Sequence, residues 1–385
     1  MTIIQKYFIQ SFVIGKVIHT TYHYHFTSIS IMSIELKYNN LGESGLKIAP
    51  IIVGCMSYGD KRWAQWVLED EEKIFQILKR CYDVGLRTFD TADVYSNGKS
   101  EELIGKFIKK FNIPRDRIVI LSKVFFPVDP QTPGFSLATR DNFPVLDYYN
   151  SQGLSRKHVL QAVQNSVERL GTYIDVLQIH RLDKDTPKKE IMKTLNDVVD
   201  QGLARYIGAS SMKVTEFAQL QFIAQLQFIA EQNHWHKFIS MQNYYNLIHR
   251  EEEREMIPFC KDNFISKVGI IPWSPIARGV LTRPVDTSSE NSRDKLDKTF
   301  KLLHLDELTD ADKEIISRVE KIAKDNKVSM AVVATAWVIS KGCNPIVGLS
   351  SVERVDDILK ATVLKLTEED IKYLEEPYVP KQPLN

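Results

Sequence analysis

Cysteine is scarce in this chain of 385 residues, and its positions exclude several kinds of site. The four cysteines are Cys55, Cys81, Cys260 and Cys343. They lie far apart, without the close spacing that zinc-binding and redox motifs require. We therefore expect reduced cysteines in the hydrophobic core, and we expect no metal site.

Long hydrophobic runs and an excess of one charge are also missing. No apolar segment approaches the roughly 20 residues of a membrane-spanning helix. Lys and Arg number 50 against 49 Asp and Glu, so the net charge is +1. This balance does not indicate a nucleic acid or an anionic membrane as a partner. We expect a small-molecule partner, no nucleic acid and no membrane.

The first 33 residues contain neither acidic residues nor arginine. They match neither a transit peptide, which is normally Arg-rich, nor a secretory signal with a small-residue cleavage site. We predict that residues 1–33 are an extension that is disordered or not translated, with translation starting at Met32. Residues 34–385 are predicted to form a single barrel domain. Missing targeting signals and reduced cysteines favour a cytoplasmic location.

Eight short apolar or β-branched segments alternate with amphipathic segments along the rest of the chain. The predicted strands are Ile51–Ser57, Leu86–Ala92, Arg117–Val124, Asp175–His180, Ala204–Ser211, Phe238–Asn243, Val268–Pro275 and Asn344–Ser350. Several of the helical segments between them begin at Ser or Asp and end at Gly, as capped helices do. Apolar strands alternating with helices indicate a parallel sheet covered by helices. Eight such units favour a (β/α)8 TIM barrel over a doubly wound open sheet.

Three further segments complete the predicted architecture. An N-terminal β-hairpin with a polar turn precedes the first strand, in residues 33–50. Long loops follow strands 3 and 7, at Phe125–Gly153 and from Ile276 to about Leu302. Loops at this end of a barrel build its active site, so we expect these two to close over a ligand.

Four reactive side chains fall at or near the C-terminal ends of neighbouring predicted strands, namely Asp90, Tyr95, Lys123 and His180. Adjacent strands lie about 4.8 Å apart, so these side chains are expected to converge at the barrel mouth. There Lys123 would lower the pKa of Tyr95, and Asp90 would keep Lys123 charged. A neutral His180 would donate a hydrogen bond to a substrate carbonyl oxygen. Taken singly, each residue is better explained as a solvated, core or capping residue.

Such a site donates a proton but has no hydride source, so a reduction would require an organic cofactor. No GxGxxG or P-loop motif occurs, which argues against a Rossmann cofactor site. Near the C-terminus a strand runs into a helix start at Ser350 and Ser351. Free N–H groups at such a start bind phosphate, and Arg354 would hold a second phosphate.

Other polar residues nearby have simpler explanations. We interpret Asp93 as a loop or cap residue, and Ser100 with Glu101 and Glu102 as a helix N-cap followed by first-turn acids. A rival function, hydrolysis by Asp90 and Asp93 as paired carboxylates, predicts that no nicotinamide binds.

Three segments in order, FDTADVYSNGKSEELIG, ILSKV and LQIHRLD, resemble signatures of the aldo-keto reductase superfamily. The resemblance runs from about Leu36 to about Leu366. It implies a barrel enzyme with a catalytic tetrad, in which Tyr95 is the general acid. The implied tetrad is Asp90, Tyr95, Lys123 and His180.

Four more segments resemble the cofactor contacts of that superfamily. YIGASSM, MQNYYNL and IPWSPIARG resemble its nicotinamide site, and VGLSSVERVDDI resembles its site for the adenosine 2′-phosphate. The implied cofactor-binding residues are Ser210, Ser211, Gln242, Trp273, Ser274, Ser350 and Arg354, and the implied cofactor is NADP rather than NAD. Two positions depart from the pattern, because Ser211 and Ile358 stand where many members carry asparagine. The second departure leaves the adenine contact unassigned.

Among the subfamilies, the chain is most similar to fungal aryl-alcohol dehydrogenases. This implies an NADP(H)-dependent oxidoreductase that reduces aldehydes to alcohols, or catalyses the reverse. An aromatic or medium-sized apolar aldehyde is predicted because four aromatic residues follow the strand ends at the mouth, namely Trp63, Trp66, Phe125 and Phe126. Aromatic residues in loops are as often internal packing as ligand walls. The alternative is an NADPH-binding regulatory protein that senses redox state and turns over slowly.

Overall fold

All eight predicted strands are present in the computed structural model. The structure describes residues 34–136, 139, 142, 144–221, 235–262, 266–285, 287 and 297–384. The strands are β3 (Ile52–Gly54), β4 (Thr88–Asp90), β5 (Val119–Val124), β6 (Ile174–Ile179), β7 (Ala204–Ser210), β8 (Phe238–Gln242), β9 (Gly269–Ile270) and β10 (Ile346–Gly348). The predicted extension at residues 1–33 lies outside the described residues, so its nature stays a prediction.

The strands form one parallel sheet that closes on itself. Its order is β10-β3-β4-β5-β6-β7-β8-β9, and every ladder is parallel. The two ends of this order meet where Trp273 bridges Ile346. The Asn344 amide donates to the Ile270 carbonyl at 2.9 Å, and the Ile346 amide donates to the Pro272 carbonyl at 2.9 Å. The predicted (β/α)8 barrel is therefore confirmed, and the open sheet is excluded.

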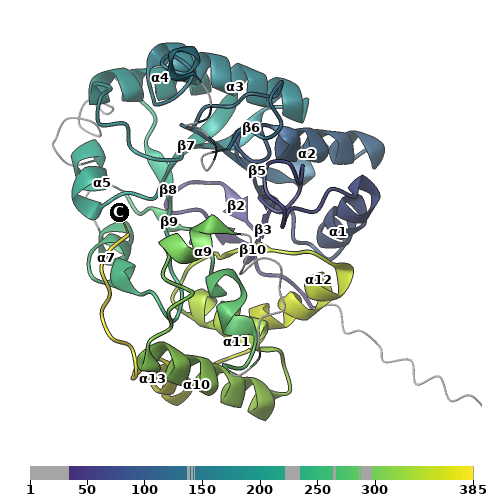
Figure 1. The fold of residues 1–385 in the computed structure, drawn as a ribbon, viewed down its shortest axis with the longest axis vertical. Coiled ribbons are helices and arrows are strands. Elements are labelled where there is room, and N and C mark those ends of the chain that lie inside the picture. The colour runs from purple at the N-terminus through teal and green to yellow at the C-terminus, as the bar shows by residue number, and fades with distance from the viewer. Residues whose placement is uncertain are drawn as a thin grey trace, which may run out of the picture. The chain divides into compact units, whose positions relative to one another are not determined.

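Helices surround the strands (Figure 1). They are α1 (Glu71–Asp83), α2 (Lys99–Lys110), α3 (Arg156–Leu170), α4 (Lys188–Asp200), α5 (Val214–Gln221), α7 (Met256–Lys261), α9 (Lys298–Leu302), α10 (Asp310–Asn326), α11 (Met330–Ser340), α12 (Val352–Ile358) and α13 (Glu368–Glu375). The predicted capping signals hold at α3, where the Ser155 side chain accepts from the His158 amide and Gly171 ends the helix with a positive φ.

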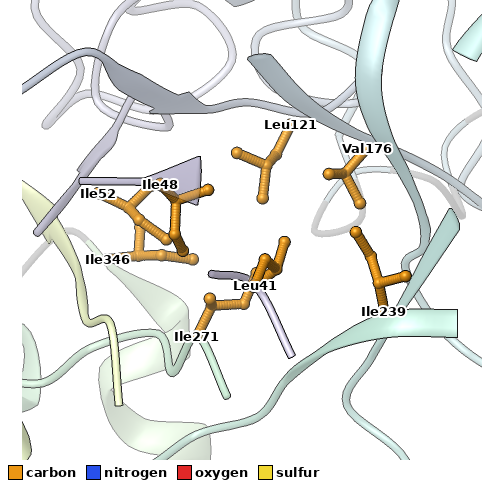
Figure 2. Packing of buried hydrophobic residues seen from close by; sticks show 8 residues of the cluster. All are labelled: Leu41, Ile48, Ile52, Leu121, Val176, Ile239, Ile271 and Ile346. Atoms are coloured by element: carbon orange, nitrogen blue, oxygen red, sulfur yellow. The ribbon is translucent and has the colours of Figure 1, made fainter. Parts of the chain in front are cut away.

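The predicted hairpin, β1 (Asn39–Asn40) with β2 (Lys47–Ile48), closes one end of the barrel. Its Leu41 and Ile48 are buried among inward-facing side chains of the strands (Figure 2). The strand partners in this cluster are Ile52, Leu121, Val176, Ile239, Ile271 and Ile346. Burying a side chain of this size stabilises the fold by about 1.5–3 kcal/mol. The hairpin thus fills the interior opposite the strands' C-terminal ends.

Both predicted long loops are present. Residues 125–155 connect β5 to α3 and contain a short 3-10 helix, Val145–Asp147. The segment after β9 contains a second 3-10 helix, Ala277–Thr282, and part of this segment lies outside the described residues. All four cysteines are buried and free, as expected. In the described part of the chain, no helix is both long and apolar enough to cross a membrane.

The hairpin turn depends on one glycine. Gly42 has a φ of +59°, and a Cβ added there would lie 2.5 Å from the Lys267 carbonyl oxygen. We predict that Gly42→Ala lowers the free energy of unfolding by about 1–3 kcal/mol, because a side chain is strained at this φ and meets backbone. Urea unfolding measures this. Gly45→Ala is the matched control, since nothing lies within 4 Å of its added Cβ. Equal losses of stability at both positions would refute the dependence of the hairpin turn on Gly42.

Candidate functional site

The four residues of the predicted tetrad come together at the C-terminal ends of β4, β5 and β6. Asp90 is the last residue of β4, Lys123 lies near the end of β5, and His180 follows β6 directly. Tyr95 lies in the turn that leads from β4 to α2. All four are buried, with at most 9% of their surface exposed. The arrangement expected from the strand pattern is therefore what the fold produces.

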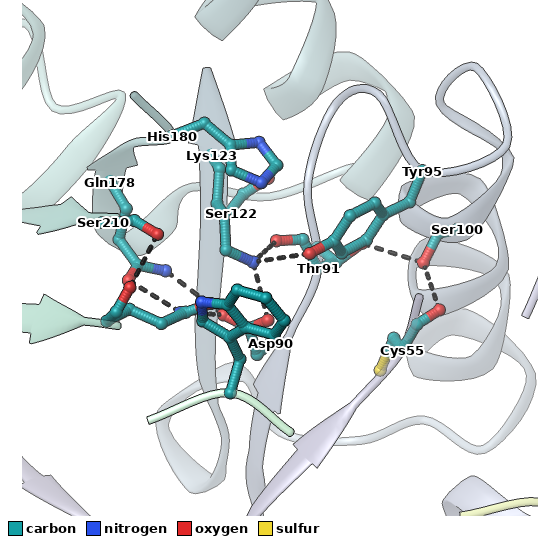
Figure 3. Close-up of polar contacts among 12 residues, drawn as sticks. Cys55, Asp90, Thr91, Tyr95, Ser100, Ser122, Lys123, Gln178, His180 and Ser210 are labelled. Atoms are coloured by element: carbon teal, nitrogen blue, oxygen red, sulfur yellow. Dashed lines mark hydrogen bonds and ion pairs between the residues drawn. The ribbon is translucent and has the colours of Figure 1, made fainter. Parts of the chain in front are cut away.

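Lys123 is the centre of the cluster (Figure 3). Its ammonium donates to Asp90 Oδ2 at 2.6 Å, to the Thr91 carbonyl at 2.8 Å and to Tyr95 Oη at 3.2 Å. These three acceptors use all three N–H donors of the group. Lys123 is therefore fixed in position although its side chain is wholly removed from solvent.

The second oxygen of Asp90 is held by two glutamines. Gln178 Nε2 donates to Asp90 Oδ1 at 3.2 Å, and Gln242 Nε2 donates to the same atom at 2.9 Å. Gln178 was not singled out in the sequence, although it lies directly opposite Lys123 in the β5–β6 register. A glutamine inside an otherwise apolar strand was the available signal. Three protein donors thus hold the carboxylate, and both of its oxygens are hydrogen-bonded.

Burial and charge act in opposite directions on this cluster. Desolvation lowers the pKa of Lys123, but Asp90 and Tyr95 more than offset this, so the pKa lies above its usual value. For Tyr95 desolvation is the larger effect and raises the pKa, whereas Lys123 lowers it. Lys123 therefore acts on the Tyr95 pKa in the predicted direction, but burial of the hydroxyl outweighs this effect. The phenol is neutral throughout the neutral pH range.

His180 is held neutral, as predicted. Desolvation, with Lys123 and Arg181 beside it, lowers the pKa of the ring well below the usual value. Its Nδ1 is buried and has no hydrogen-bond partner among the described residues. The ring lies edge-on to Tyr95, with centroids 5.9 Å apart. A neutral imidazole beside the Tyr95 phenol is able to donate one hydrogen bond to an oxygen that the phenol also contacts.

Aromatic side chains line the space beside Tyr95. Trp63 and Phe126 pack with the Tyr95 cluster, together with Met56 and Val128. The Trp63 ring centroid is 6.5 Å from that of Tyr95, and the Phe126 centroid is 5.0 Å from that of His180. The other two predicted aromatic residues pack on these rings, Trp66 on Trp63 and Phe125 on Phe126. Two of the four predicted aromatics therefore border the tetrad.

Three of the predicted cofactor residues form a hydrogen-bonded group at the ends of β7 and β8. Ser210 Oγ donates to the Gln242 carbonyl at 2.8 Å and lies 3.2 Å from Ser211 Oγ. Ser211 has a φ of +46°, which is unusual for a residue other than glycine or asparagine. Its amide donates to Gln242 O at 3.0 Å and to Asn243 Oδ1 at 2.9 Å, which holds the backbone in this conformation.

Asn243 links this group to Trp273, and sequence reasoning missed it. The Trp273 amide donates to the Asn243 carbonyl at 3.0 Å, and Trp273 Nε1 donates to Ser211 Oγ at 3.2 Å. The Trp273 ring packs on Tyr244, with centroids 4.6 Å apart. Ser274 has a φ of +53°, and its carbonyl accepts from an asparagine amide at 3.1 Å. The residues after β7, β8 and β9 therefore form one connected wall.

Ser350 and Arg354 lie after β10, the next strand around the barrel. Arg354 Nη1 donates to Ser350 Oγ at 2.7 Å, and Arg354 is exposed. Ser351 rather than Ser350 caps α12. Ile358 is buried within α12. Ser350 and Arg354 therefore lie together, separate from the tetrad but at the same end of the barrel.

The prediction that Ser100 caps α2 was wrong, whereas Glu101 and Glu102 lie in the first turn of this helix as predicted. Gly98, with a φ of +89°, precedes the helix, and Ser100 lies inside it. Ser100 Oγ donates to the Cys55 carbonyl at 2.9 Å and accepts from Thr91 Oγ1 at 2.8 Å. The left-handed turn before the helix shifts its start to Lys99, which directs Ser100 into the barrel wall.

Asp93 lies in the turn before α2, as a loop residue should, but both Asp93 and Glu101 are buried. Glu101 is fully buried, where it accepts from Ser122 Oγ and from Arg169 Nε, the latter at 2.8 Å. Asp93 is 1% exposed, and neither carboxyl oxygen has a hydrogen-bond partner among the described residues. Desolvation and the Glu101 charge raise the pKa of Asp93 well above its usual value. A neutral, unpaired Asp93 does not form the paired carboxylates of a hydrolase.

The fold agrees with comparisons against known proteins. The model of the family described as "Aldo/keto reductase family" matches residues 50–378. The chain is 57% identical over 349 residues to "Putative aryl-alcohol dehydrogenase AAD16" of Saccharomyces cerevisiae, covering 91% of this chain and 99% of that protein. It is 54% identical to the versiconal hemiacetal acetate reductase of Aspergillus parasiticus, covering 90% and 98%. It is 44% identical to the aldo-keto reductase AMT2 of Alternaria alternata, covering 92% and 95%.

The buried Asp93 predicts a pH-dependent effect on stability. The pKa of Asp93 is higher in the folded than in the unfolded chain, where it is near 3.9. Between these two pKa values only the unfolded chain ionises Asp93, so the free energy of unfolding falls by about 1.4 kcal/mol per pH unit as the pH rises. Asp93→Asn should therefore be more stabilising at pH 7 than at pH 5, as measured by urea unfolding. Asp306→Asn, at an exposed carboxylate, is the control. A mutant effect that is equal at both pH values would show that Asp93 is ionised in the fold.

Proposed function

This chain belongs to the aldo/keto reductase family, and from that premise we propose that it reduces aromatic aldehydes to alcohols with NADPH, or catalyses the reverse. The family consists of oxidoreductases that act on small molecules with a nicotinamide cofactor. The observation that carries the proposal is the buried contact of the Tyr95 hydroxyl with the Lys123 ammonium, which Asp90 anchors.

Tyr95 acts as the general acid. Its phenol is neutral at physiological pH because burial raises its pKa, so the proton to be donated is present. Positive charge on Lys123 stabilises the phenolate that remains after transfer. The Asp90 carboxylate keeps that charge in place, and the 3.2 Å contact between Lys123 Nζ and Tyr95 Oη makes the stabilisation direct.

His180 orients the substrate carbonyl. Its neutral ring lies beside the Tyr95 phenol, so an imidazole N–H and the phenol converge on one carbonyl oxygen. Negative charge develops on that oxygen during reduction, and both donors then bind it more strongly than they bind the aldehyde. Because the ring is a neutral imidazole and not an acidic imidazolium, His180 serves as a hydrogen-bond donor and not as the general acid.

The wall after β7, β8 and β9 fits a nicotinamide cofactor. Ser210 and Ser211 offer short hydroxyl side chains suited to a carboxamide, and Trp273 offers a ring face beside them. Gln242 would contribute its side-chain oxygen, because its Nε2 already donates to Asp90 and Gln178. Ser211 is kept at a strained φ, a kind of cost that proteins usually retain at ligand sites. When bound, the cofactor supplies the hydride that these side chains lack. Ser274 follows Trp273 and extends the same wall.

Ser350 and Arg354 favour NADP over NAD. Arg354 is exposed, and in the described part of the chain its side chain has one hydrogen-bond partner, the Ser350 hydroxyl. A guanidinium with free donors is suited to a phosphate, which it binds through two parallel hydrogen bonds. The adenosine 2′-phosphate of NADP is the group that these two residues would hold.

The aromatic border of the site favours an aromatic substrate. Trp63 and Phe126 lie on the outer side of Tyr95 and His180. Offset or edge-to-face contacts with such rings stabilise a bound aromatic ring beyond its buried area. The similarity to a putative aryl-alcohol dehydrogenase supports the same substrate class, because an aryl alcohol carries an aromatic ring.

We predict that Tyr95→Phe lowers kcat for benzaldehyde reduction at least about a hundredfold, the lower range for loss of a general acid. The loss of NADPH absorbance measures turnover, and NADPH fluorescence measures binding, which should persist in the mutant. Tyr206→Phe is the matched control, because Tyr206 packs against the opposite end of the barrel. Comparable kcat values for Tyr95→Phe and the wild type would refute Tyr95 as the acid. NADPH binding without any turnover by the wild type would favour the regulatory alternative.

A further inference from the structure

Arg181 is a cation at the border of the site with few partners. It follows His180 directly after β6 and is partly buried. Its Nη1 donates to the His180 carbonyl at 2.7 Å, and this is its one hydrogen bond to the described residues. A guanidinium carries five N–H donors in a fixed planar fork. Most of the donors of Arg181 are therefore available to a ligand.

No acidic residue neutralises this charge within the described part of the chain. Asp183, two residues further on, instead organises the turn. It accepts from the Leu154 amide at 2.7 Å, from the Thr186 hydroxyl at 2.7 Å and from the Asp185 amide at 3.0 Å. Arg278 shows the usual arrangement for a buried arginine, in an ion pair with Asp297. Arg181 has no such ion pair with the described residues.

A desolvated cation without a counter-ion is costly for the fold. Desolvation lowers the pKa of Arg181. Packing compensates little, because the guanidinium carbon lies 5.8 Å from the centroid of the Phe126 ring, at the outer limit of a cation–π contact. Uncompensated charges of this kind are expected at sites that bind an opposite charge.

The position of Arg181 indicates the substrate rather than the cofactor. Its charge lowers the pKa values of both Tyr95 and His180, so it is close to the reacting groups. It contacts Phe126, in the loop after β5, whereas the proposed nicotinamide wall follows β7, β8 and β9. An anionic group held by Arg181 would therefore belong to the molecule that lies along Phe126.

We propose that Arg181 binds an anionic oxygen of the substrate, so that the preferred substrates are aromatic aldehydes that carry a carboxylate or a phenolate. This inference rests on the proposed reductase function and specifies its substrate class. In this arrangement the aromatic ring of the substrate packs beside Trp63 and Phe126, and the aldehyde oxygen lies between Tyr95 and His180. The Arg181 guanidinium binds the carboxylate or phenolate.

The test compares matched substrates in the wild type and in Arg181→Met. The meta and para isomers of carboxybenzaldehyde are each paired with the methylbenzaldehyde of the same geometry, which has no charge. We expect the wild type to prefer one carboxylated isomer in kcat/KM. In Arg181→Met that preference, measured as the ratio of kcat/KM for the carboxylated compound to kcat/KM for its methyl counterpart, should fall roughly ten- to a hundredfold, the range for a charge-assisted hydrogen bond. Benzoate, as an inhibitor of methylbenzaldehyde reduction, should weaken in parallel.

Two further variants separate the explanations. Arg62→Met is the matched control, because it removes the same charge from an exposed ion pair with Asp60, and it should leave the preference intact. Arg181→Lys keeps the charge without the fork and should retain part of the preference even if Arg181→Met folds poorly. A wild type that reduces neither series would refute the reductase function itself. A wild type that reduces both, with a carboxylate preference that is missing or unchanged in both Arg181 variants, would overturn only the assignment of Arg181.

Discussion

The buried ion pair between Lys123 and Asp90 is the interaction on which the site depends. Two unpaired charges in this interior would be prohibitively costly. The pair is tolerated because all three donors of the ammonium and both oxygens of the carboxylate are hydrogen-bonded. The barrel makes this possible, since parallel register places Lys123 opposite Gln178 and Asp90 one strand away. Removing either partner would leave an uncompensated buried charge. The ion pair therefore stabilises the ends of β4 and β5 in the same positions that bring the tetrad together.

Desolvation then determines the protonation states around the pair. It raises the pKa of Tyr95 and lowers the pKa of His180, so both side chains are neutral beside a charged lysine. The same buried environment therefore keeps Tyr95 protonated as the acid, His180 neutral as a hydrogen-bond donor and Lys123 positively charged. The same burial leaves Asp93 neutral, whereas Glu101 is buried with Arg169 as its partner. The difference between the two carboxyls is the presence of a cation in contact.

The sequence was sufficient for features that depend on local pattern. All eight strands were predicted, because β-branched runs separated by capped helices have few alternatives, and the ends of those strands located Asp90, Lys123 and His180. Features that depend on distant contacts were missed. Arg169, the partner of Glu101, is 68 positions away in the sequence. Asn243 Oδ1 accepts from the Ser211 backbone amide, 32 positions away. The effect of Lys123 on the Tyr95 pKa was predicted, but the larger effect of burial was not, because burial of the hydroxyl cannot be read from neighbouring residues.

The pH dependence of kcat/KM for aldehyde reduction tests the central claim most directly. A protonated Tyr95 with a raised pKa and a neutral His180 should give activity that is constant through the neutral range and falls only in the alkaline range, as the phenol loses its proton. Tyr95→Phe should remove the alkaline limb together with most of the activity. A fall in activity as pH rises through about 6.5, the ordinary value for histidine, would contradict the account and identify an imidazolium as the acid.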